Sequence, residues 1–191
     1  AVAAMCGVMV AILIKMGIAW PIALVMVLIL GAIVGLFNSV LVNVFKLQPF
    51  IATLATASVC EGFGYIICNG RSVGISKQSF IFMGSGKIAG IPVPVIILII
   101  FFIVFGFILA KTIFGRSVYM IGGNVTAARL AGLNPEKLST ILYVMSSVIG
   151  ALAGVILAAR MHSGAPTAVH GAEFDAITAA VLGGVVFSGG T

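Results

Sequence analysis

The chain has 191 residues, of which 62% are hydrophobic and only 7% are charged, and its mean hydropathy is +1.32. Soluble domains carry about 25% charged residues, so this composition excludes a water-soluble globular protein. The formal net charge is +6. The basic residues are spread along the chain and form no run, which argues against nucleic acid as a partner.

The size of the chain limits its architecture. A transmembrane helix needs about 20 mostly apolar residues, so the chain has room for about five spans and for no separate soluble domain. We therefore expect an all-α fold, a polytopic transmembrane helix bundle that forms a single domain over residues 1–191. Because the chain opens without a methionine and stops directly after a hydrophobic run, we also expect a fragment truncated at both ends.

The apolar runs predict the spans in chain order. The first run, residues 1–14, is too short by itself to cross a bilayer. Complete spans are predicted over residues 19–45, 49–68, 93–110 and 138–159. The run over 49–68 is interrupted by polar residues and glycines, so it belongs inside the bundle. The run over 93–110 has no polar residue and should face lipid.

Two predicted spans contain glycine pairs at a spacing that favours close helix packing. Gly31 and Gly35 form one pair, and Gly150 and Gly154 form the other. Small residues four positions apart let the backbone of another helix approach closely in lipid. The alternative is that these glycines have no special role, because glycine is common in membrane helices.

The basic residues do not orient the chain by number alone. If the chain has five spans, its connections alternate between the two sides of the membrane, and five of the ten basic residues fall on each side. The positive-inside rule therefore does not decide the orientation. Four of them lie in one connection, residues 111–137. This concentration favours placing that connection in the cytoplasm.

The residues do not predict an enzyme. Serine, histidine and acidic residues form no recognisable catalytic arrangement, and the cysteines and histidines are not at metal-ligand spacing, so we expect neither catalysis nor a metal site. Residues 84–87, Gly-Ser-Gly-Lys, lack the first glycine of a Walker A motif and the Ser or Thr that follows its lysine. Any energy for transport must therefore come from an ion gradient or from a partner.

Glu61 is the most informative single residue, because it lies within a predicted span. A carboxylate there costs at least about 2.5–3.5 kcal/mol on insertion scales and must face protein or water. Glu61 is therefore a functional candidate. Two structural alternatives remain open: it forms a pair with a basic residue of another helix, or it lies close enough to the helix end to be hydrated.

The last apolar run, residues 172–187, is broken by Gly183 and Gly184. We expect a discontinuous or re-entrant helix here, of the kind found at transport sites. Glu173 and Asp175 lie near its start, where capping of the helix explains them and contact with a substrate is the alternative. The two histidines of the preceding loop are expected to be solvated.

Several stretches resemble one known family. Residues 115–124, Gly-Arg-Ser-Val-Tyr-Met-Ile-Gly-Gly-Asn, followed by residues 127–133, Ala-Ala-Arg-Leu-Ala-Gly-Leu, resemble the cytoplasmic coupling loop of ribose-type ABC sugar permeases. Residues 48–54, residues 90–95 and residues 173–190 resemble the same family in the same order. Together these stretches cover most of the chain.

This resemblance implies a function and a set of partners. The chain would be a permease subunit in the bacterial inner membrane that forms the path for ribose or another monosaccharide. Its partners would be a second permease subunit, expected to be an identical copy, an extracytoplasmic sugar-binding protein, and two ATPases that bind ATP and Mg. The resemblance also places Lys46 and residues 111–137 inside, and residues 69–90 and 161–171 outside.

The resemblance and the residue types together predict two groups of site residues. Residues 115–135 form the coupling loop, which reads as a glycine turn, a short alanine-rich helix that sits in a groove of the ATPase, and a second glycine stop. Its expected coupling residues are Gly122, Gly123, Asn124, Ala127, Ala128, Arg129 and Gly132. The expected path residues, chosen as groups that suit a neutral sugar, are Gln48, Phe50, Thr53, Thr56, Glu61, Asn69, Glu173 and Asp175.

Other functions remain as alternatives. Related permeases carry nucleosides, and permeases for branched-chain amino acids are distant relatives of the same family. A different class is an ion-coupled secondary transporter, in which Glu61 would bind a proton or cation and the broken last helix would bind the substrate. A membrane scaffold without transport is the third possibility.

Overall fold

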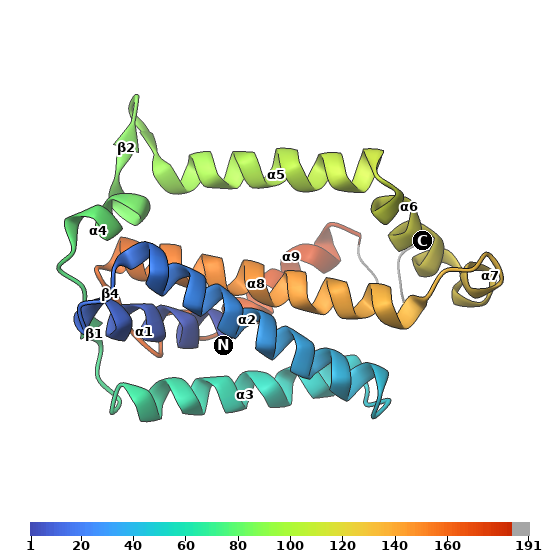
Figure 1. Cartoon of the computed structure of the whole chain (residues 1–191), viewed down its shortest axis with the longest axis horizontal. Helices are drawn as coiled ribbons and strands as arrows, with labels where there is room; N and C mark the ends of the chain where they lie inside the picture. The colour runs from blue at the N-terminus through green and yellow to red at the C-terminus, as the bar shows by residue number, and fades with distance from the viewer. Residues whose placement is uncertain (185–191) are drawn as a thin grey trace.

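The computed structural model describes residues 1–184 and is mostly helical (Figure 1). The helices of this part are α1 (Val2–Lys15), α2 (Trp20–Asn43), α3 (Pro49–Ile67), α4 (Gln78–Ser85), α5 (Val93–Lys111), α6 (Ile113–Gly123), α7 (Val125–Leu130), α8 (Pro135–Met161) and α9 (Ala172–Leu182). Four strands of two residues each accompany them, β1 (Val73–Gly74), β2 (Lys87–Ile88), β3 (Ile91–Pro92) and β4 (Ser163–Gly164). The expected all-α fold is thus correct for the helices and misses two small sheets.

Four of the described helices, α2, α3, α5 and α8, are long and apolar enough to cross a membrane. They match the four complete spans predicted from the sequence. The expectation of about five spans is one too many for the described residues, because α1 has only 14 residues. At 1.5 Å per residue such a helix is about 21 Å long, which is less than the roughly 30 Å of a bilayer core.

The two small sheets close the connections at one end of the bundle. Strands β1 and β4 pair antiparallel, with Val73 opposite Gly164. This pairing brings residues 69–90 and residues 161–171 to the same end, as the predicted topology requires. Strands β2 and β3 form a hairpin that leads into α5. Between the sheets, α4 anchors its connection by burying Phe80 completely.

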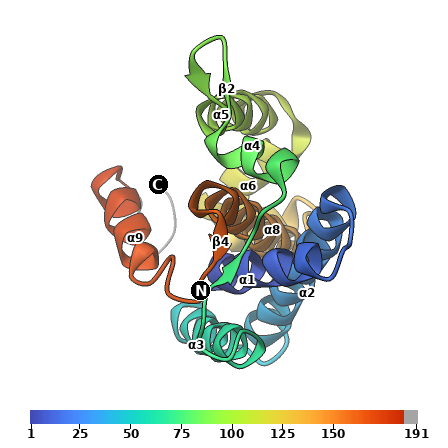
Figure 2. The ribbon, with the colours of Figure 1, turned by 90° about the vertical axis from the view of Figure 1, so that its left-hand side faces the viewer.

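Helix α8 lies at the centre, with α1 and α2 packed along it (Figure 2). A Cβ atom added at Gly35 would lie 2.7 Å from the carbonyl oxygen of Tyr143, and one added at Gly31 would lie 2.7 Å from the Cβ atom of Ala151. A Cβ atom added at Gly154 would likewise overlap the backbone of Ala3. Close packing is therefore confirmed at Gly31, Gly35 and Gly154.

Helix α5 stands apart from this core. No residue of α5 is buried within the described part of the chain. The helix contacts α4 at its beginning and α6 at its end, and Figure 1 shows it running beside α8 at a distance. An exposed, entirely apolar helix agrees with the predicted lipid-facing span.

The segment before α9, residues 161–171, is only partly exposed. It turns back along α1, where Gly164 packs against the backbone of Gly7 and Val8 and where Pro166 is buried. Helix α9 then begins beside the N-terminus of α1 and ends at Leu182, before the first predicted glycine break. The rest of the predicted broken helix, from residue 185, lies outside the described residues.

Candidate functional site

The predicted coupling residues form a turn between two helices at one end of the bundle. The Oδ1 atom of Asn124 accepts a hydrogen bond from the N–H of Ala127 at 3.0 Å and so caps α7. Gly132 follows α7 with φ +81°, a left-handed conformation that favours glycine. The sequence predicted one short helix here. The structure has two, because Thr112 caps a further helix, α6, by accepting from the N–H of Gly115.

Of the small residues that the sequence favoured for contact with a partner, Ala127 is exposed on α7 and Ala128 is not. Ala128 is only 2% exposed, and its carbonyl accepts from the N–H of Leu133 at 3.0 Å. Ala128 therefore packs within this chain and offers no contact surface. Leu130 is 86% exposed and Val125 is 47% exposed, so the apolar surface of α7 lies on these two residues. An isolated leucine in a polar connection was the sequence signal for it.

Polar contacts connect α7 to the core of the bundle. Arg129 forms an ion pair with Glu136 in the first turn of α8, so its guanidinium is already engaged within the chain. The carbonyl of Glu136 accepts from Nδ2 of Asn43 at 3.2 Å, and Asn43 also donates to Ser39 and to Thr140. Ser39 in turn donates to Thr140 at 2.7 Å. These contacts link α7, α8 and α2, and sequence patterns did not reveal them.

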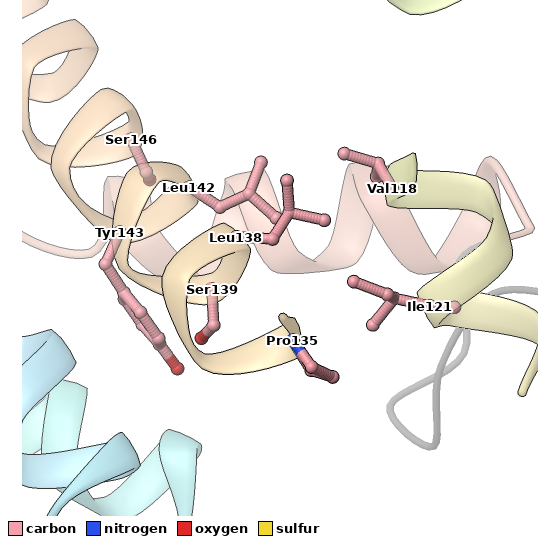
Figure 3. Close-up of a pocket in the computed structure, with 9 residues that line it drawn as sticks. Val118, Ile121, Pro135, Leu138, Ser139, Leu142, Tyr143 and Ser146 are labelled. Atoms are coloured by element: carbon pink, nitrogen blue, oxygen red, sulfur yellow. The ribbon is translucent and has the colours of Figure 1, made fainter. Parts of the chain in front are cut away.

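A cavity of about 470 Å³ lies beside this network, between α6 and α8. Figure 3 shows Val118 and Ile121 of α6 facing Leu138 and Leu142 across it. The hydroxyl groups of the cavity come from α8, on Ser139, Tyr143 and Ser146. Apolar side chains of α6 and α8 thus face each other across this cavity, next to the turn that contains the predicted coupling residues.

Four of the predicted path residues lie at the start of α3. Gln48 precedes the helix, and Phe50 is 43% exposed. The hydroxyl of Thr53 donates to the carbonyl of Pro49 at 2.9 Å. The buried hydroxyl of Thr56 likewise donates to the carbonyl of Ala52, at 3.1 Å. Both threonine hydroxyls are thus bonded within their own helix and keep only acceptor capacity for a sugar.

Two other predicted path residues, Glu61 of α3 and Glu173 of α9, line one small cavity. The Oε1 atom of Glu61 accepts a hydrogen bond from Nδ1 of His170 at 3.1 Å, about 9 Å along the axis from the end of α3. Glu173 lines the same small cavity, together with Pro166 and Val169. His170 is exposed, as expected, but the returning segment before α9 also brings it to Glu61, a contact that the sequence did not predict. Glu61 is thus paired with a histidine of the turn before α9, and not with a basic residue of another helix as the structural alternative had it.

The predicted path residues do not converge on one site. The cavity beside Glu61 has a volume of only about 10 Å³, roughly that of one water molecule. Asn69 lies at the other end of the bundle, exposed and with φ +50°. Asp175 is exposed on α9. The described residues therefore contain a group at the start of α3 and a separate pair, Glu61 and His170, with Glu173 beside it.

The pair between Glu61 and His170 predicts a non-additive pattern of stability. Glu61→Gln and His170→Ala should each lower the melting temperature of the full-length permease in detergent, and the double variant should lose no more than the larger single loss. The shared energy should be about 0.5–1 kcal/mol, because both side chains are partly exposed. Asp175→Asn, which removes a charge that forms no ion pair among residues 1–184, is the control. Additive losses would contradict the pairing.

The four candidate spans among residues 1–184 define a polytopic membrane protein. Comparison with known families makes this specific. The whole chain, residues 1–191, matches the family described as branched-chain amino acid transport system / permease component, and it belongs to that family. The chain is thus a permease component, which confirms the expectation of a transport subunit rather than an enzyme.

Curated relatives refine this relationship. The chain is 42% identical over 153 residues to the L-arabinose transport system permease protein AraH of Escherichia coli, covering 80% of this chain and 47% of the relative. It is 40% identical over 176 residues to the ribose import permease protein RbsC of Haemophilus influenzae, covering 89% of this chain and 54% of the relative. The chain therefore spans about half the length of these relatives. No solved structure matches it.

These relatives confirm the resemblance to ribose-type permeases. The Bacillus subtilis ribose import permease protein RbsC is also similar, with 41% identity over 155 residues. All of these relatives are bacterial permeases, and residues 1–184 include four helices able to cross a membrane. The chain is accordingly a multi-pass protein of the bacterial inner membrane.

Proposed function

We propose that this chain is part of the membrane-spanning permease of an ABC importer for a monosaccharide such as arabinose or ribose. The observation that carries the proposal is the identity of about 40% to arabinose and ribose permeases over 80% or more of the chain. Transport of a nucleoside or a branched-chain amino acid is the alternative within the same mechanism. The chain itself would bind no cofactor, and ATP and Mg would be bound by the partner ATPase.

In this proposal, α7 is the segment that docks on the ATPase. It is a short helix outside the four spans, and it presents Leu130 as a nearly fully exposed apolar side chain. The turn between α2 and α3, which contains Lys46, lies at the same end of the bundle (Figure 1). The two segments that the sequence placed in the cytoplasm thus lie together, which supports a shared contact surface for the ATPase.

Movement of α7 would be passed to the core through the polar contacts described above. The ion pair between Arg129 and Glu136 ties α7 to the start of α8, and Asn43 ties that turn of α8 to α2. Because α8 packs tightly against α1 and α2, a displacement of its first turn would tilt these helices together. The path for the sugar would then open between this permease and a second permease subunit, towards the docked binding protein.

Uptake of labelled substrates tests the substrate class. The full-length permease, its ATPase and its binding protein are expressed in cells that lack pentose importers, and uptake of arabinose, ribose and leucine is compared. We expect uptake of one or more of the sugars and none of leucine, and loss of uptake when the Walker A lysine of the ATPase is replaced. Uptake of leucine in preference to both sugars would contradict the proposal.

A further inference from the structure

A second groove in the molecule lies between α5 and α8 and is entirely apolar. Its volume is about 550 Å³, and α5 lines one side while α8 lines the other with Ile149, Leu152, Ala153 and Ile156. The two helices do not pack on each other along this length. Helix α4 contacts both of them at one end, and α6 contacts both at the other end. Figure 1 shows α4 and α6 at the two ends of the gap between α5 and α8.

The size of the groove limits what can occupy it. The part of α5 that lines it, from Pro94 to Leu109, is about 22 Å long. A single lipid tail is thin and extends over one leaflet, about 15 Å, so it fits within this length. The groove thus has the length and the apolar lining that an acyl chain requires.

One end of the groove carries positive charge. Arg160 lies four residues after Ile156 and seven after Ala153 on α8, so it continues the face that lines the groove. Arg160 is exposed and forms no ion pair among residues 1–184. Lys87, also exposed, lies in the hairpin that precedes α5. The sequence has no acidic residue between Glu61 and Glu136, so no carboxylate of the hairpin, α4 or α5 neutralises this end.

We propose that the groove binds one phospholipid, with an acyl chain between α5 and α8 and the phosphate on Arg160. An arginine guanidinium donates charge-assisted hydrogen bonds to phosphate, and such bonds are strong where water is scarce. The bound tail fills the space that keeps α5 away from α8 and lets α5 pack against the core through lipid. The lipid is thus a structural component of the permease, and its binding does not depend on which substrate is transported.

Photolabelling of the full-length permease with its ATPase tests this proposal. The complex is placed in nanodiscs that contain phosphatidylethanolamine and a phosphatidylglycerol with a diazirine in the middle of one acyl chain. After illumination, we expect labelled peptides from the facing sides of α5 and α8. Ala153→Phe should remove most of this labelling, because Ala153 is an exposed small residue of the groove and the phenyl ring fills the space.

Ile103→Phe is the matched control, because Ile103 is 66% exposed on α5 and does not line the groove. This variant should keep the labelling of wild type. Arg160→Gln, which leaves the groove open, should lower labelling by the phosphatidylglycerol about tenfold, and Arg160→Lys should restore part of it. Labelling that is equal in wild type and Ala153→Phe, or unchanged by Arg160→Gln, would overturn the proposal. So would a cross-link from the groove to a protein segment in wild type.

Discussion

Replacing Leu130 with glutamate is expected to separate the permease from its ATPase while leaving the membrane bundle folded. Leu130 is 86% exposed at the end of α7, so the folded chain loses no packing when it changes. Within an apolar docking surface the new carboxylate would be desolvated without a partner. Truncation of a central interface residue costs about 2 kcal/mol or more, which corresponds to about a thirtyfold loss of affinity.

Co-purification of the full-length permease with its ATPase measures this effect. Met16→Glu is the matched control, because Met16 is an apolar side chain that is 73% exposed in the turn at the opposite end of the bundle. We expect full recovery of the ATPase with this control and strongly reduced recovery with Leu130→Glu. Equal recovery with both variants would remove α7 from the contact with the ATPase. Ala128→Glu is less suitable, because Ala128 is buried and its replacement would disturb the permease itself.

Gly154→Val should destabilise the bundle strongly, whereas Gly150→Val on the same helix should be tolerated. A Cβ atom at Gly154 would overlap the backbone carbonyl of Ala3 in α1. Backbone cannot move aside as a flexible side chain does, so α1 and α8 would have to separate, at a cost of about 1–3 kcal/mol or more. A Cβ atom at Gly150 meets no atom of the described chain within 4 Å.

Thermal unfolding of the full-length permease in detergent compares the two variants directly. Both change the same residue type to valine in the interior of one helix, so helix propensity affects both equally. The difference between their melting temperatures therefore reports the contact with α1. Similar melting temperatures for Gly154→Val and Gly150→Val would show that α1 and α8 do not approach closely in the membrane.

Glycine spacing illustrates where the sequence stops being informative. The pattern treats Gly150 and Gly154 alike, and the structure shows that only Gly154 faces α1. Hydropathy predicted α2, α3, α5 and α8 to within three residues at each end, because a bilayer imposes length and composition on every span. Hydropathy does not predict which helices pack against each other.

The candidate site was predictable to the extent that it is local in sequence. The short helix α7 was predicted from a continuous motif, and Asn124 caps it through a local hydrogen bond. The partner of Glu61 was missed because His170 is 109 residues away in the chain. The link from Asn43 to Thr140 was missed for the same reason, since it joins residues 97 positions apart. The sequence did not show which alanine of α7 is buried, because Ala127 and Ala128 are adjacent and only Ala128 packs within the chain.

Transport in proteoliposomes tests most directly whether this permease works in an ATP-driven importer of monosaccharides. The full-length permease is reconstituted with its ATPase, its binding protein and labelled arabinose or ribose, with no ion gradient. We expect accumulation of sugar only when ATP is supplied on the ATPase side, and no accumulation with Leu130→Glu. Uptake that follows an imposed proton or sodium gradient without ATP would contradict the claim and favour an ion-coupled transporter.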